Sequence, residues 1–190
     1  MQVEVYSAEP QTDIVHAQAT QGKDAGAAWQ PIPRRPASSG AVSGLASALA
    51  KLVGGGCIIR GRADLDVGGP LACAHVSTDS LVPLRVCFAA NPHAFASACS
   101  AHVVQTRRVL HLPAITSTVL RLWSESQASA YLQQHQIRSL IVAPVPMRTE
   151  IRATLVLWRE ARSPRFKDAD AQVLCTLAAR LAPILLRARP

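Results

Sequence analysis

Cysteine and histidine side chains are the groups in this chain with the greatest capacity for chemistry. Cys73 and His75 stand two apart, a spacing that puts both side chains on one face of a β-strand. Cys99 and His102 stand three apart, which gives a shared face on a helix. A structural zinc site needs four ligands in tetrahedral geometry, and nothing in the sequence forces these two pairs together. We therefore expect no metal site.

No familiar catalytic motif accompanies these residues. The sequence contains no GxSxG, no P-loop, no HExxH and no HxE with CxxC, so we expect binding rather than catalysis. The five cysteines are odd in number and far apart, which indicates reduced thiols in the cytoplasm. Neither a secretory signal nor an apolar run long enough to span a membrane occurs, so we expect a cytoplasmic protein with no membrane span.

Composition narrows the classes of partner. Apolar residues make up 49% of the chain and aromatic residues 4%, so a core has to be built mainly from Ala, Leu, Val and Ile. The net charge of +8 favours acidic protein surfaces or nucleic acid. The arginines are scattered and no DNA-binding motif occurs, so we do not expect a nucleic-acid partner. The Ala- and Arg-rich composition suggests a bacterial source.

Hydrophobic periodicity divides the chain into an arm and one domain. Residues 1–40 are rich in Gln, Thr, Ala, Gly and Pro, which predicts a disordered arm, with a docking peptide as the alternative. From residue 41 to residue 190 the pattern predicts a single domain. It begins with a helix over 41–53, in which Leu45, Leu49 and Leu52 share a face.

Apolar runs, turn residues and helix-capping residues predict the remaining strands and helices. We expect strands over 57–62, 71–78, 109–112, 137–145 and 151–158, with a turn over 146–149. We expect helices over 91–105, 124–135 and 168–186, the last with an apolar face of Leu174, Leu177, Leu181 and Leu185. This order predicts an α/β fold of the α+β kind. Its mainly antiparallel sheet of five to six strands has the first and last helices on one face.

The closing third of the chain carries a family resemblance. The stretch 137–145 (IRSLIVAPV) is similar to the "SLLVVPL" strand of GAF domains, and 152–158 (RATLVLW) to the "GVLVL" strand that follows it. The stretches 165–170 (RFKDAD) and 174–182 (LCTLAARLA) resemble the entry to and the body of that family's last helix. Lys167 stands where the family has a capping Ser or Thr, so we expect Asp168 to cap instead.

The resemblance implies a ligand pocket between one sheet face and the central helical segment. By position, its candidate walls are Cys73, His75, Phe88, Phe95, His111, Ile115, Tyr131 and Ile141. Covalent bilin attachment in the family uses a Cys-His dipeptide, which this chain lacks, so we expect no covalent bilin. Haem bound through His111 is not expected either, because a lone histidine at a strand end is usually only hydrogen-bonded.

The resemblance also implies a function. We expect a sensory or regulatory domain of bacterial signal transduction that binds a small molecule, or that forms a homodimer through the leucines of its first and last helices. One alternative is a ligand-free adaptor that binds an acidic protein partner. Another is a thiol-based reductase of free methionine sulfoxide. That activity would need a cysteine just before residue 137, where none occurs, and leaves only Cys87 and Cys99 as a conceivable pair.

Overall fold

A computed structural model gives the fold of the domain. It describes residues 39–61, 71–90, 97–116, 131, 134–147 and 150–187. Residues 1–38 of the arm expected over 1–40, the start of the helix that we expected from residue 91, and Phe95 lie outside the described residues, whereas residues 39 and 40 already belong to the first helix. Most of the helix expected over 124–135 also lies outside them, although Tyr131 and Gln134 are helical.

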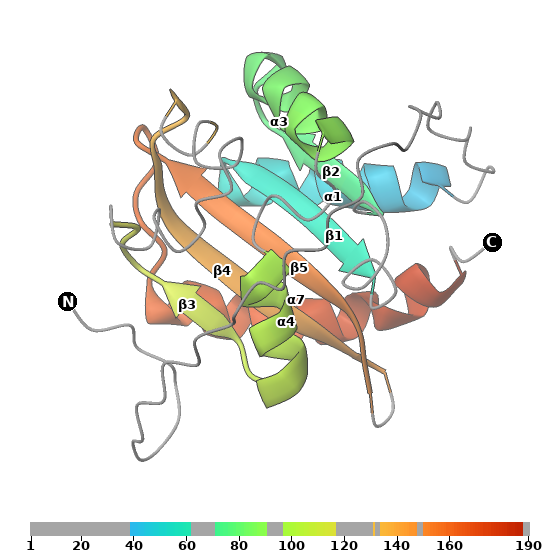
Figure 1. The fold of residues 1–190 in the computed structure, drawn as a ribbon. Helices are drawn as coiled ribbons and strands as arrows, with labels where there is room; N and C mark the ends of the chain where they lie inside the picture. The colour runs from blue at the N-terminus through green and yellow to red at the C-terminus, as the bar shows by residue number, and fades with distance from the viewer. Residues whose placement is uncertain are drawn as a thin grey trace, which may run out of the picture.

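Within the described ranges, five antiparallel strands form one sheet (Figure 1). Their order is β2 (Ala72–His75), β1 (Gly56–Gly61), β5 (Glu150–Glu160), β4 (Ile137–Met147) and β3 (Leu110–Leu112). The two longest strands, β4 and β5, lie at the centre as a hairpin and are almost continuously buried. The antiparallel five-stranded sheet and the α+β class were both predicted correctly.

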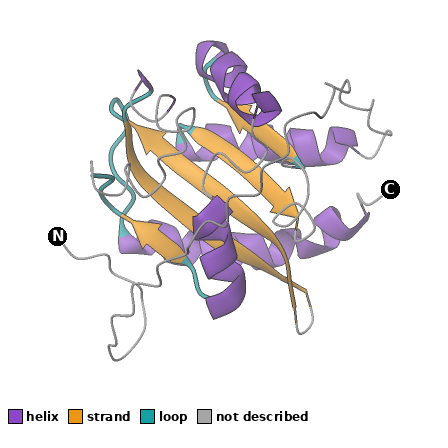
Figure 2. Cartoon of the chain, viewed as in Figure 1, coloured by secondary structure: helices purple, strands orange, loops and turns teal. Residues whose placement is uncertain are grey.

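Helices cover both faces of this sheet (Figure 2). On the terminal-helix face, α1 (Ser39–Val53) and α7 (Asp168–Arg187) share one apolar core with β1, β4 and β5. On the opposite, central-helix face, α3 (Thr78–Ala90) and α4 (Ser97–Thr106) share a second core with the sheet. In Figure 1, α4 crosses in front of β4 and β5, whereas α1 and α7 lie behind the sheet. The shared position of the first and last helices agrees with the sequence.

Local chemistry explains where the terminal helices begin and end. Gly54 has φ +68°, the left-handed conformation that ends α1, and the Gly55 N–H donates to the Ala50 carbonyl at 3.1 Å. At the start of α7, the Lys167 N–H donates to the Asp170 carboxylate at 2.9 Å. The expectation that Asp168 caps this helix was therefore wrong, because Asp170 reaches back to the first turn instead.

Three expectations about the strands and helices need correction. The helix α3 was not predicted; the Ser77 hydroxyl accepts from the Asp79 N–H at 3.2 Å and begins this helix, so β2 ends at His75 instead of reaching residue 78. Strand β4 continues to Met147, which leaves two residues for the turn that we expected over 146–149. A register irregularity between Val145 and Pro146 lets the strand continue through its prolines.

Candidate ligand-binding face

The sheet register arranges the central-helix face in transverse rows of side chains. One row runs through Ile58, Val156, Val142 and Leu110, which are all apolar and belong to one core. A parallel row contains Gly56, Trp158, Leu140 and Leu112. The third row, toward the end of β1, contains Arg60, Thr154 and Pro144. Of these three rows, the row at the end of β1 is therefore the one that contains polar side chains.

Arg60 is the unusual residue of this third row. Its side chain is completely buried, and its guanidinium carbon lies 5.4 Å from the centre of the Phe88 ring on α3. Such a stacked arrangement is a cation–π contact, which is stronger where water is excluded. Strand β1 and helix α3 together therefore hold a positive charge inside the central-helix face.

Two buried hydroxyls lie on the same side of the sheet. Thr154 stands directly opposite Arg60 in the register, and Ser100 comes from α4, which packs against β4 and β5. Both residues are completely buried, and neither side-chain oxygen has a hydrogen-bond partner within the part of the chain that the structure describes. Buried polar groups in proteins nearly always have such a partner, so these two hydroxyls are exceptions among the described residues.

A second polar cluster lies at the opposite end of the same face, where β5 ends. The Nε2 atom of His75 lies 2.9 Å from Oε1 of Glu160, and the Ser77 N–H donates to Nδ1 of His75 at 3.0 Å. Nδ1 of His135 lies 3.2 Å from the Ser80 hydroxyl and 3.9 Å from Glu160. This cluster links β2, β5 and the first turn of α3.

Burial changes the ionisation of two groups in this cluster. It lowers the pKa of His135, although Glu160 acts in the opposite direction. Burial also raises the pKa of Tyr131, whose ring centre lies 4.3 Å from that of His135. Both shifts favour neutral side chains against the sheet.

Comparison with known proteins decides the family. The model of the GAF domain family matches residues 22–185, which is most of the chain. This chain belongs to the GAF domain family. A comparison with curated protein sequences gives no match.

Solved structures agree on the fold. The GAF domain region of a protein from Geobacter sulfurreducens is 13% identical, covers 79% of this chain and 93% of its own, and has a TM-score of 0.54. A GAF domain from an Acinetobacter phosphoenolpyruvate-protein phosphotransferase is 16% identical. The match covers 80% of this chain and 83% of that domain, with a TM-score of 0.51. A type II free methionine-R-sulfoxide reductase from Thermoplasma acidophilum is 14% identical. The match covers 79% of this chain and 95% of that enzyme, with a TM-score of 0.50. Such low identities show the fold and no more.

The GAF domain brings most of the described pocket candidates to the central-helix face. Phe88 and Tyr131 belong to its core, and Cys73 and Ile115 pack against that core. The ring of His75 lies 6.0 Å from that of Trp158, which is in the same core.

The other two described candidates lie elsewhere. Ile141 lies in the core of the terminal-helix face. His111 faces the same helices, with Nδ1 3.0 Å from Asp168 and Nε2 3.2 Å from the Phe166 carbonyl. His111 therefore joins β3 to the start of α7, on the same side of the sheet as Ile141 and on the opposite side from the other five described candidates.

Three of the five cysteines lack the lowered pKa of an activated thiol. Burial raises the pKa of Cys57, Cys73 and Cys87, whereas reactive cysteines have a lowered pKa. The described parts of the chain bring together no group of three or more His, Cys, Asp or Glu residues that could hold a metal ion. They also include no helix with the length and apolar character needed to cross a membrane.

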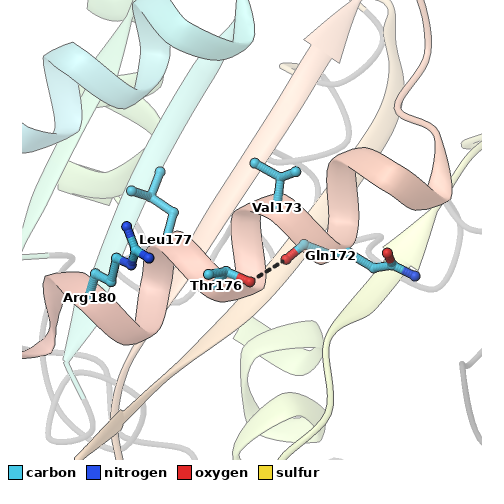
Figure 3. A pocket seen from close by; sticks show the side chains of 5 residues that line it. All are labelled: Gln172, Val173, Thr176, Leu177 and Arg180. Carbon is cyan, nitrogen blue, oxygen red and sulfur yellow. Dashed lines mark hydrogen bonds between the residues drawn. The ribbon is translucent and has the colours of Figure 1, made fainter.

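The leucines expected at a dimer interface divide into three groups by exposure. Leu49, Leu174 and Leu181 are buried in the core, and Leu45, Leu177 and Leu185 pack partly against it. Leu52 is 64% exposed, as are Val173 at 63% and Ile184 at 44% on α7. A shallow hollow of about 360 Å³ lies on α7, lined by Gln172, Val173, Thr176, Leu177 and Arg180 (Figure 3). The outer surface of α7 is therefore partly apolar.

Proposed function

We propose that this GAF domain is a sensory or regulatory domain of bacterial signal transduction that binds a small molecule on its central-helix face. The observation that supports this function is the pair of buried hydroxyls there, Thr154 and Ser100, which have no hydrogen-bond partner among the described residues and belong to a largely apolar face. Small-molecule sites in proteins are mostly apolar with a few placed polar groups. On the terminal-helix face, by contrast, the buried Ser139 and His111 are satisfied by Phe166 and Asp168.

Native mass spectrometry of freshly purified protein tests this proposal. We expect a mass above that of the denatured chain by the mass of one small molecule. Thr154→Val removes the buried hydroxyl with little change of shape and should weaken retention. Thr176→Val makes the same change on exposed α7 and should retain the ligand as the parent does. Equal native and denatured masses, together with no thermal stabilisation by any compound of a metabolite library, would contradict the proposal.

A second proposed function is homodimerisation through the outer surfaces of α1 and α7. Val173, Leu177 and Ile184 lie four and seven positions apart, which places them on one side of α7. Val173 and Ile184 remain exposed, and α7 packs beside α1, which exposes Leu52. Exposed apolar surface of this kind commonly marks a protein interface.

Light scattering coupled to size-exclusion chromatography tests the dimer. The double change Val173→Glu with Ile184→Glu should convert a dimer into a monomer. Val82→Glu with Val86→Glu is a matched control, because these two α3 valines are 64% and 63% exposed. A monomeric parent at high concentration, or equal disruption by both pairs, would contradict an interface on α1 and α7.

We further propose that the domain acts in the cytoplasm by binding rather than by catalysis. All five cysteines are free, as is usual for cytoplasmic proteins, and burial holds three of the thiols in their protonated form. Turnover of free methionine sulfoxide that is lost in Cys87→Ser or Cys99→Ser would contradict this proposal. The adaptor alternative predicts an empty central-helix face and an acidic protein that co-purifies with the basic chain.

A further inference from the structure

We propose that the loop over 161–167, between β5 and α7, is a docking surface for an acidic segment of a partner protein. Its exposed cations, Arg162, Arg165 and Lys167, pair with carboxylates of that segment. This inference goes beyond the proposed small-molecule function and does not depend on the central-helix face, so either can fail without the other. Figure 1 shows the loop along the left side of the molecule, where it leads from the arrowhead of β5 to the start of α7.

The loop concentrates positive charge at the surface. Arg162, Arg165 and Lys167 stand within six residues, and the loop itself contains no acidic residue. All three side chains are exposed, and none of them forms an ion pair with another described residue. Exposed cations of this kind attract an anionic partner and raise the rate at which it associates.

The acidic residues that follow the loop are already engaged by other groups. The carboxylate of Asp170 lies 3.3 Å from the guanidinium of Arg159 on β5. The carboxylate of Asp168 lies 3.0 Å from Nδ1 of His111 on β3. These two carboxylates therefore hold the start of α7 against the sheet, and the side-chain charges of the loop are left for another molecule.

Hydrogen bonds hold the backbone of the loop in place. The guanidinium of Arg159 donates to the carbonyls of Pro164 and Arg165, each at 3.4 Å. The Ser163 hydroxyl donates to the Gly54 carbonyl at the end of α1, at 2.9 Å. A surface that is ordered before its partner arrives loses less conformational entropy on binding, which favours affinity.

Two further cations lie on the elements that the loop contacts. The Ser139 hydroxyl accepts the Phe166 N–H at 3.1 Å, which brings the loop to the start of β4, where Arg138 is exposed. The contact with Gly54 likewise brings the loop to the end of α1, where Lys51 is exposed in the last turn. The positive surface therefore extends from the loop onto both of its neighbours.

The surroundings of these cations favour an acidic protein segment over nucleic acid. Proteins that bind single strands combine cations with exposed aromatic rings on which bases stack. Phe166, the aromatic residue of the loop, is buried, and Arg159 stacks on its ring at 4.2 Å. The arginine fork matches a carboxylate, and one exposed ion pair contributes little affinity. The partner therefore has to present several carboxylates close together, as an Asp- or Glu-rich segment does.

Fluorescence anisotropy with defined probes tests this inference on the whole chain. The probes are fluorescein-labelled octaglutamate, a labelled octamer of alternating Gly and Ser, and a labelled oligothymidylate. At an ionic strength of about 0.05 M, where exposed charges are weakly screened, we expect octaglutamate to bind and the uncharged octamer not to bind. The affinity for octaglutamate should fall as salt is added, and oligothymidylate should bind more weakly than octaglutamate.

A triple variant locates the binding to the loop. Arg162→Gln with Arg165→Gln and Lys167→Gln should raise the Kd of octaglutamate by ~5- to 50-fold, because three exposed ion pairs are lost together. These side chains are exposed, so the variant should keep the fold of the parent, which thermal denaturation checks.

A matched triple variant controls for net charge. Arg107→Gln with Arg108→Gln and Arg180→Gln removes the same charge from exposed positions outside the loop. Because more distant charges are partly screened, this variant should raise the Kd of octaglutamate by less than ~3-fold.

Several results would overturn the inference. Equal weakening by both triple variants would show that the protein responds to net charge and not to the loop. Tighter binding of oligothymidylate than of octaglutamate would make the partner a nucleic acid. No binding of octaglutamate by the parent would remove the acidic partner. Tighter binding after Glu4→Gln with Glu9→Gln and Asp13→Asn would show that the acidic residues of this chain's own arm compete for the loop, and that its partner is this chain.

Discussion

The two faces of the sheet are built from the same strands but differ in how they treat polar groups. On the terminal-helix face, Ser139 accepts the Phe166 N–H at 3.1 Å, and His111 meets Asp168 and the Phe166 carbonyl. On the central-helix face, Thr154 and Ser100 are buried without a partner among the described residues. Paired buried groups such as Ser139 and His111 contribute to stability, whereas buried groups without a partner reduce it.

The largest effect that this comparison predicts is a cavity in the terminal-helix core. Leu157 is completely buried between β5 and the terminal helices, whereas Leu52 on α1 is 64% exposed. Leu157→Ala should lower the free energy of unfolding by about 2–5 kcal/mol, because it removes buried methyl groups and leaves a cavity. Leu52→Ala should change it by less than about 0.5 kcal/mol. Chemical denaturation measures both, and equal losses would contradict the assignment of this face as the packed one.

The next largest effect on stability is expected at Gly56, which packs against Trp158 on the central-helix face, with Gly44 in α1 as its comparison. A methyl group on Gly56 would overlap the Trp158 ring, whereas one on Gly44 in α1 would meet no atom within 4 Å. Gly56→Ala should lower the free energy of unfolding by about 1–3 kcal/mol because Trp158 has to move. Gly44→Ala should raise it by about 0.5–1 kcal/mol through helix propensity. Denaturation midpoints test both signs, and a Gly56→Ala variant as stable as the parent would show that Trp158 is loosely packed.

Removing one buried hydroxyl from each face gives the most direct comparison of the two faces. Ser139→Ala leaves the buried Phe166 N–H without its acceptor and should cost about 1–3 kcal/mol. Thr154→Val removes a hydroxyl that has no partner among the described residues, so in ligand-free protein it should be neutral or slightly stabilising. Denaturation of the ligand-free variants is the measurement. A cost for Thr154→Val equal to that of Ser139→Ala would show that the two faces do not differ in this respect.

The sequence predicted best those elements whose signals are local. The β4–β5 hairpin and α7 follow from long apolar runs, a short turn and a capped amphipathic helix, and their positions agree closely with the structure. Helix α3 gave no such signal. Pro83 lies inside it, and its valines at 82 and 86 are exposed while Leu84 and Phe88 are buried, so apolar residues occur on both sides. Its packing, and not its periodicity, determines that it is a helix.

The candidate site was predictable only in part. Residues such as Cys73 and Tyr131 could be assigned to the central-helix face from their element and position. Arg60 could not, because an arginine on a strand is usually exposed, whereas this one packs against Phe88 of α3, a helix that begins 18 residues later in the sequence. Likewise, two aspartates begin α7, and the sequence does not reveal that His111 binds one while the other caps the helix.

The smallest effect predicted is the pH dependence of the cluster at the end of β5. Burial lowers the pKa of His135 below its usual value of 6.5, while Glu160 opposes this shift and His75 adds to it. The unfolded chain therefore takes up a proton at a higher pH than the folded domain, and the free energy of unfolding should fall as the pH drops below about 6.5. Above that pH, His135 is neutral in both states and contributes no pH dependence.

His135→Gln tests this origin of the effect. The variant keeps a polar side chain near the Ser80 hydroxyl and removes the titrating group. Denaturation at a series of pH values from 5 to 8 should give a smaller loss of stability on the acid side for His135→Gln than for the parent. An equal loss in both proteins would assign the acid sensitivity to other groups. A larger loss in the parent would show that burial of His135 makes this end of the central-helix face sensitive to acid.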